Sequence, residues 1–112
     1  MLITKILRVF ALFAILLASP LHSYATELRG RVDGMHPYAP KPFPFGGAKV
    51  DLYILLPRGA RFIRSAYTGG DGMYYFSKIR PGKYTLIVNG KLNIPLLVEP
   101  RQSQDIPPIL FR

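Results

Sequence analysis

The side chains that could carry out catalysis are few and widely spaced in this sequence. Beyond residue 25 the chain has one histidine, His36, and no cysteine occurs anywhere. A nucleophilic triad needs a histidine held between a carboxylate and a serine or cysteine, and no serine after residue 25 stands in a nucleophile motif. A zinc site needs three or four histidine, cysteine or acidic ligands. The sequence therefore predicts no enzymatic activity, no metal site and no other cofactor.

Positive charge is the chemical feature that the sequence offers instead. The chain carries 15 Lys plus Arg against 6 Asp plus Glu, which gives a formal net charge of +9. Six of the basic residues fall beside two predicted turns: Arg58, Arg61, Arg64, Lys78, Arg80 and Lys83. If the two turns lie at the same end of the fold, these residues form one positive rim, where arginine holds a carboxylate or phosphate through two parallel hydrogen bonds. The alternative is solvated charge that protects sheet edges from aggregation.

The segment Met35–Gly47 is a second candidate for binding. It contains four prolines, and aromatic side chains are interleaved with them at Tyr38, Phe43 and Phe45. Proline fixes φ near its extended value, so the segment is expected to run as polyproline II or irregular loop. Two interpretations stay open: a stiff aromatic finger that docks on a partner, or a long loop whose rings pack on the edge of the fold.

The amino-terminal 25 residues have the three zones of a secretory signal peptide. Lys5 and Arg8 supply the positive start, and Val9–Ala18 is an unbroken apolar run. Ser23-Tyr24-Ala25 then has small residues at the two positions that a signal peptidase reads. The alternative, an uncleaved membrane anchor, needs roughly 20 apolar residues, whereas this run is ten residues long. We therefore predict a cleaved signal peptide over residues 1–25 and one mature domain over residues 26–112.

The predicted cleavage changes both the charge and the setting of the protein. It removes two positive charges and no acid, so the formal net charge falls from +9 to +7. The mature chain is expected to be periplasmic or extracellular, without a membrane span. A charge of this sign attracts lipid headgroups, acidic polysaccharide or an acidic protein partner, whereas nucleic acid is not expected as the partner of an exported protein.

Between frequent Pro and Gly breaks, apolar residues recur with a period of two, which indicates short strands with one buried face. Seven segments are predicted as strands: Leu28–Asp33, Ala48–Leu56, Arg61–Thr68, Met73–Ser77, Lys83–Asn89, Leu92–Val98 and Gln104–Phe111. The last of these is the least regular. Six or seven short strands separated by turns predict an all-β sandwich or barrel.

The alternation also predicts which side chains point inward. The expected inward set is Leu28, Gly30, Val32, Val50, Leu52, Ile54, Tyr74, Phe76, Tyr84, Leu86 and Val88. Arg61–Thr68 is ambiguous, because an alternation that contains Phe62 competes with one that contains Ile63. Pro107-Pro108 confines the last strand to a sheet edge, because proline cannot donate a hydrogen bond to the ladder.

Three blocks of the sequence stand out in order. They are Gly47-Ala48-Lys49-Val50-Asp51-Leu52, Thr68-Gly69-Gly70-Asp71-Gly72-Met73-Tyr74-Tyr75-Phe76 and Ile79-Arg80-Pro81-Gly82-Lys83-Tyr84-Thr85-Leu86-Ile87-Val88. Together they resemble the carboxypeptidase regulatory-like domain family over roughly Leu28–Val88. The resemblance implies an antiparallel prealbumin-like (Ig-like) β-sandwich. In that family such domains serve as accessory modules beside enzymes, as stalks or as sugar-contacting domains, so the resemblance sets only a prior for function.

The leading functional hypothesis is a non-enzymatic exported accessory or structural module that contacts another protein at the cell surface or in the periplasm. The candidate partner-binding residues are Arg58, Arg61, Lys78, Arg80, Lys83, Tyr38, Phe43 and Phe45. The alternative is a carbohydrate-binding domain that recognises a polysaccharide, including an anionic one. Sugar sites present exposed aromatic platforms, and the chain has no Trp. The tyrosines that would have to serve are Tyr38, Tyr53, Tyr67 and Tyr75.

Overall fold

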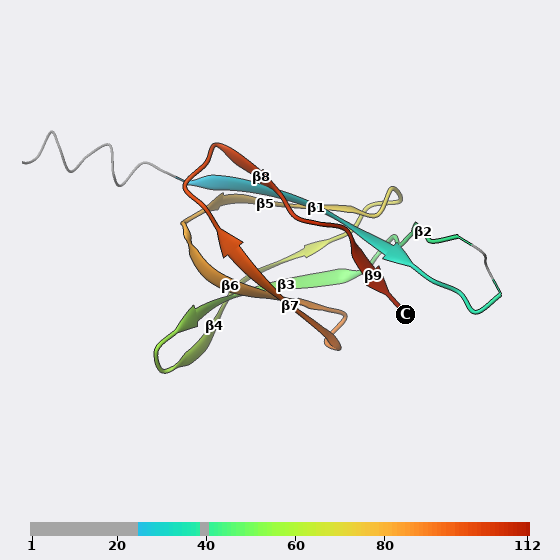
Figure 1. Ribbon diagram of the computed structural model, residues 1–112, viewed down its shortest axis with the longest axis horizontal. Coiled ribbons are helices and arrows are strands. Elements are labelled where there is room, and N and C mark those ends of the chain that lie inside the picture. The colour runs from blue at the N-terminus through green and yellow to red at the C-terminus, as the bar shows by residue number, and fades with distance from the viewer. Residues whose placement is uncertain (1–24, 39–40) are drawn as a thin grey trace, which may run out of the picture.

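The computed structural model describes residues 25–38 and 41–112, which form two β-sheets packed face to face (Figure 1). The predicted signal peptide lies outside these residues, apart from Ala25. Over the described ranges no helix has the length and apolar character needed to cross a membrane.

Nine strands make up the two sheets. Their bounds are β1 Thr26–Gly34, β2 Phe43–Pro44, β3 Lys49–Leu56, β4 Gly59–Tyr67, β5 Met73–Ile79, β6 Gly82–Val88, β7 Leu92–Val98, β8 Ser103–Asp105 and β9 Ile109–Phe111. In the first sheet β1 pairs with β2, β5, β8 and β9, and the second sheet has the order β4-β3-β6-β7. Each predicted strand is confirmed, the last of them as two short strands, and β2 is added from the proline-rich segment.

The chain end shows why the last strand is divided. Both β8 and β9 pair with β1 alone, so they form a sheet edge, as predicted. Pro107-Pro108 falls between them, where no ladder hydrogen bond is needed. Both strands run parallel to β1, whereas every other pairing is antiparallel, because the chain crosses from β7 in the second sheet and returns along β1 in the first.

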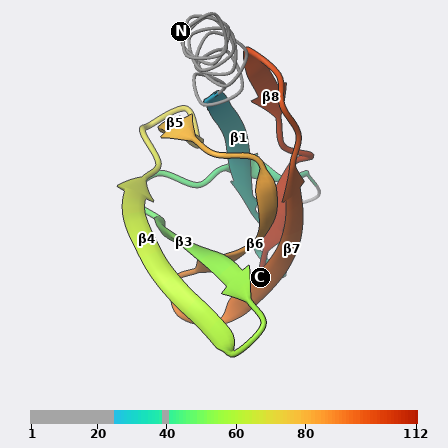
Figure 2. The same cartoon turned by 90° about the vertical axis from the view of Figure 1, so that its left-hand side faces the viewer.

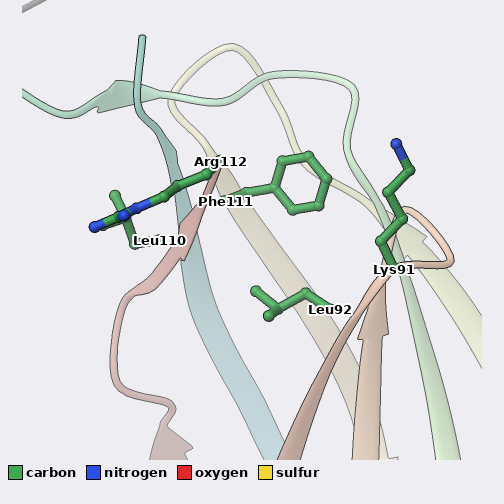
Figure 3. Close-up of a pocket in the computed structure, with 5 residues that line it drawn as sticks. All are labelled: Lys91, Leu92, Leu110, Phe111 and Arg112. Carbon is green, nitrogen blue, oxygen red and sulfur yellow. The ribbon is translucent and has the colours of Figure 1, made fainter. Parts of the chain in front are cut away.

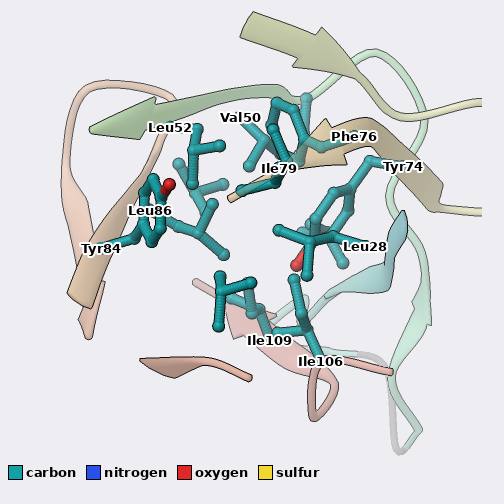
Figure 4. Close-up of a cluster of buried hydrophobic side chains, with 14 residues drawn as sticks. Leu28, Val50, Leu52, Tyr74, Phe76, Ile79, Tyr84, Leu86, Ile106 and Ile109 are labelled. Carbon is teal, nitrogen blue, oxygen red and sulfur yellow. The ribbon is translucent and has the colours of Figure 1, made fainter. Parts of the chain in front are cut away.

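The core lies between the inward faces of the two sheets (Figure 4). It consists of fourteen buried apolar side chains: Leu28, Val32, Ala48, Val50, Leu52, Tyr74, Phe76, Ile79, Tyr84, Leu86, Val88, Val98, Ile106 and Ile109. The predicted inward faces of β1, β3, β5 and β6 are confirmed, with Ile54 half-buried beside them. Alternation was a reliable guide in these strands because one face of each is fully covered.

Tyr74 fills the centre of this core and constrains β1. Its ring packs edge-on against Phe76 with 6.0 Å between the ring centroids. Its hydroxyl is buried with no hydrogen-bond partner among the described residues, and burial raises its pKa well above the ordinary tyrosine value. A Cβ at Gly30 would lie 2.2 Å from that hydroxyl oxygen. This inward-facing position therefore requires glycine, because any larger side chain would overlap the tyrosine.

Candidate functional site

A β-bulge in β4 explains why the sequence did not show which side chains of this strand point inward. Leu52 pairs with Arg64 and Tyr53 pairs with Phe62, so Ile63 is an extra residue in β4. Residues 61 and 64 would point to opposite faces of a regular strand, because side chains alternate. The extra residue changes this alternation, as bulges do when they redirect a side chain.

The bulge places two arginines on the inner face of the second sheet. Arg64 lies opposite Leu52 and Arg61 lies opposite Ile54, and both of these partners face the core or its margin. Phe62 remains on the outer face with Tyr53, where the two rings pack edge-on at 5.5 Å. Two guanidinium groups therefore reach the gap between the sheets from one strand.

A second bulge lies across that gap in β5. Thr26 pairs with Ile79 but Leu28 pairs with Phe76, so Ser77 and Lys78 together face Glu27 of β1, which forms no ion pair with Lys78 among the described residues. Lys78 has φ +56°, in the left-handed region that residues other than glycine rarely adopt. The Ser77 carbonyl accepts a hydrogen bond from Arg64 Nη1 at 2.9 Å, which joins the two sheets. The bulge thus costs backbone strain and turns Lys78 toward the same place as the arginines.

Between the two bulges lies a hollow of about 270 Å³. We call it the cationic hollow, and its lining is Ile54, Arg61, Ile63, Arg64, Lys78, Ile79, Arg80 and Tyr84. Four cations stand around an apolar base. The Tyr84 hydroxyl donates a hydrogen bond to the Arg80 carbonyl at 2.7 Å, which holds the β5–β6 turn in place. Burial raises the pKa of Tyr84, and the positive charge of Arg80 opposes that rise.

The cations of the hollow form no ion pair within the part of the chain that the structure describes. Its ion pairs are Arg29–Asp105, Arg31–Asp33, Lys49–Asp51 and Arg101–Glu99. None of these involves a residue of the cationic hollow. Like charges gathered without a counter-ion repel one another, and the arrangement is stabilised when an anion enters. Carboxylate and phosphate are the groups that arginine recognises through its planar fork.

The structure therefore brings the two predicted basic groups to one place. Arg61, Lys78 and Arg80 line the cationic hollow together with Arg64. Lys83 lies just outside, in a shallow neighbouring hollow, and Arg58 occupies the β3–β4 turn. Sequence reasoning missed the two bulges and the apolar base between them. The one available signal was the pair of competing alternations in β4, which is what an extra residue produces.

The aromatic residues of the proline-rich segment lie at the opposite end of the sandwich (Figure 1). Phe45 packs edge-on against Phe111 at 5.4 Å and contacts the core. Phe43 lies over Gly34, where a Cβ would be 2.7 Å from its ring. Tyr38 is 90% exposed. Of the three rings, Phe45 alone packs on the edge of the core, while Phe43 is 42% exposed. The structure therefore agrees with the second of the two interpretations for Phe45, and it does not bring any of the three rings to the basic residues.

A smaller hollow of about 240 Å³ lies at that same end (Figure 3). Its lining is Lys91, Leu92, Leu110, Phe111 and Arg112. One wall is the Phe111 ring that also packs on Phe45, so this hollow is the margin of the loop packing. Over residues 25–38 and 41–112, no three His, Cys, Asp or Glu side chains gather in a way that could hold a metal ion.

No family model and no curated protein matches the sequence. Among solved structures, the chain is similar to GBS52, the minor pilin of the Gram-positive pathogen Streptococcus agalactiae, with a TM-score of 0.59 and 16% identity over 75% of this chain and 43% of the pilin. It is also similar to (S)-allantoin synthase, with a TM-score of 0.47 and 15% identity over 78% of this chain and 42% of the enzyme. The chain spans less than half the length of either protein. The second superposition is too poor to carry an argument, and the first shows the fold: the protein is an all-β sandwich of the kind found in the pilin.

Proposed function

We propose that the protein is a non-enzymatic exported structural module that contacts another protein at the cell surface or in the periplasm. The cationic hollow is the contact site, and an acidic segment of the partner is its ligand. One observation carries the proposal: two bulges, one in each sheet, bring Arg61, Arg64 and Lys78 to a hollow that Arg80 of the β5–β6 turn also lines, and the described lining of this hollow contains no carboxylate. The likeness to a minor pilin is compatible with a structural role at a surface.

Edge protection alone does not account for this arrangement. Bulges and inward-pointing charges do protect edge strands from pairing with other chains, and β4 is an edge strand. Charges of mixed sign would protect an edge equally well and would avoid the repulsion among four cations. The left-handed backbone at Lys78 adds a further cost, and such costs are found where function requires them. A ligand of opposite charge offsets both.

A polysaccharide ligand has weaker support from the geometry. Tyr67 pairs with Lys49 on the outer face of the second sheet, and Tyr75 pairs with Arg29 on the outer face of the first. The two exposed rings therefore face away from each other and cannot form one stacking platform. The Tyr53 ring packs edge-on against Phe62, so it already has a contact within the protein. Anionic polysaccharide is retained as the alternative because the cations alone would attract it.

The proposal is tested by measuring the affinity of residues 26–112 for a fluorescent glutamate-rich peptide by anisotropy. We expect the triple variant R61Q/K78Q/R80Q to bind about a hundredfold more weakly, since each charge contributes about a factor of five. The control K41Q/K91Q/R112Q removes the same charge at the opposite end of the sandwich and is expected to change affinity by less than threefold.

Two results would contradict this account. Equal losses in the two triple variants would mean that net charge alone governs binding. Binding to an alginate oligomer but not to the peptide would support the polysaccharide alternative instead. Far-UV circular dichroism of each variant checks that the sandwich is intact.

A further inference from the structure

The β3–β4 hairpin carries apolar side chains that the fold leaves uncovered. Leu55, Leu56 and Phe62 are exposed by 45%, 42% and 51%, and Leu97 on β7, which β6 separates from the hairpin, by 57%. A two-residue turn joins the strands, because Leu56 pairs directly with Gly59. Figures 1 and 2 show this hairpin projecting from one end of the sandwich. Exposed apolar groups gathered at one place mark an interaction surface.

Most of these apolar groups share one face of the second sheet. Leu55, Pro95 and Leu97 line a shallow hollow of about 310 Å³ with Lys83 at its side, and Lys83 and Leu97 are direct partners across β6 and β7. Phe62 pairs with Tyr53 and so lies on the same outer face as Leu55. Leu56 adds an exposed apolar side chain next to the turn, on the opposite face of the hairpin. We call this set the hairpin surface, and it comprises Leu55, Leu56, Phe62, Pro95 and Leu97.

The charge close to the hairpin surface is mainly positive. Arg58 stands in the turn and Lys83 lies beside Leu97, whereas Arg61 faces the cationic hollow. Neither the stretch 52–64 nor the stretch 77–87 contains an acidic residue, and Glu99, two residues beyond Leu97, is paired with Arg101. A protein interface usually depletes charge at its centre and pairs the charges at its rim. Apolar side chains on a projecting turn, with the cations Arg58 and Lys83 beside them, instead suit the surface of a lipid bilayer, whose interior is apolar and whose headgroups can be anionic.

We propose that the hairpin surface docks on a bilayer that contains anionic lipid. Leu55, Leu56 and Phe62 enter the level of the headgroups, while the basic side chains extend to the lipid phosphates, as long cationic side chains do at such boundaries. Each cation near an anionic surface strengthens binding by about fivefold, and so does each apolar side chain that moves from half exposure to full burial. The proposal goes beyond contact with a protein partner and does not require Arg64, Lys78 or Arg80.

Flotation of residues 26–112 with lipid vesicles tests the inference. This segment holds every described strand and the whole described core. We expect binding to vesicles of phosphatidylcholine with phosphatidylglycerol and at least tenfold weaker binding to phosphatidylcholine alone. L56S and R58Q are each expected to weaken binding about fivefold. Y75S removes a side chain of comparable exposure (60%) from the other sheet and should change binding by less than twofold.

A spectroscopic measurement separates insertion from simple charge attraction. The chain has no Trp, so F62W introduces a single indole into the hairpin surface without removing its apolar character. We expect its fluorescence to shift to the blue on anionic vesicles and to be quenched by brominated lipid, whereas Y75W shows neither effect. Equal binding to both vesicle types, equal losses in L56S and Y75S, or an unquenched F62W would each overturn the inference. Loss of vesicle binding with retention of the acidic peptide would leave the proposed function in place.

Discussion

The two ends of this sandwich use their distinctive residues in opposite ways. At the end of the proline-rich segment, the Phe45 ring packs on Phe111 and the backbone groups of Phe45 are paired: its N–H donates to the Val32 carbonyl at 3.0 Å, and the Thr68 hydroxyl donates to its carbonyl. At the other end, Arg61 and Lys78 stand among like charges with no carboxylate partner in the described chain.

The difference separates residues that stabilise the fold from residues that remain available for binding. A ring such as Phe45 removes apolar area from water and so contributes to folding. The cations of the hollow contribute repulsion, and Lys78 adds strain. Residues that lower stability are better candidates for function than residues that raise it. Substitutions at the two ends should therefore have opposite effects on folding and binding.

The largest expected effect on stability is at the loop end, where Gly72 has φ +77° and a Cβ would lie 2.6 Å from the Val32 carbonyl oxygen. Because that neighbour is backbone and cannot move aside, G72A should lower the free energy of unfolding by about 3 kcal/mol. Urea denaturation measures it. G70A, in open space of the same turn, is the control and should change stability by about 0.5 kcal/mol or less. A similar loss in both variants would mean that the turn, rather than the contact, is responsible.

The next effect separates the aromatic residues of the proline-rich segment from one another. F45A should lower the free energy of unfolding by about 2 kcal/mol, because the half-buried ring loses its contacts with Phe111 and the core. Y38A, whose side chain is 90% exposed, should lower it by about 0.5 kcal/mol or less. Thermal unfolding of the pair measures the difference. Should the two variants unfold alike, the loop end would not be the packed region described above.

The smallest effect on stability is expected at the cationic end, and it has the opposite sign. K78G relieves the left-handed strain and one repulsive charge, and the flexibility of glycine in the unfolded chain offsets part of that gain, so the protein should be stabilised by about 0.5 kcal/mol. K78A removes the charge and keeps the strain. Both should bind the glutamate-rich peptide about fivefold more weakly. A clear loss of stability in K78G would show that Lys78 serves the fold, and the contrast between the ends would fail.

Most of the sandwich could be predicted from its sequence, because alternation survives wherever one face of a strand is completely covered. The buried face of β3 is set by Val50 and Leu52, and that of β6 by Tyr84 and Leu86. The short β2, which pairs with β1, could not be predicted, because the prolines of its segment indicate an irregular loop rather than a strand.

The candidate site was predictable only as a list of basic residues. Their convergence depends on two bulges, and a bulge is a one-residue change in register that local propensity does not encode. Ile63 gave a hint through the ambiguous facing of its strand. Nothing in the sequence around Ser77 indicated that Lys78 would adopt a left-handed conformation, because glycine, the usual residue for that conformation, is absent there.

The central claim is that the cationic end, and not the proline-rich end, is where a partner binds. Mapping of amide chemical shifts by NMR while the glutamate-rich peptide is titrated into residues 26–112 tests it most directly. The account predicts that the largest shifts fall on residues 61–64 and 77–80, while residues 35–38 and 41–45 stay unchanged. Shifts concentrated in the proline-rich segment, with the hollow unaffected, would contradict it.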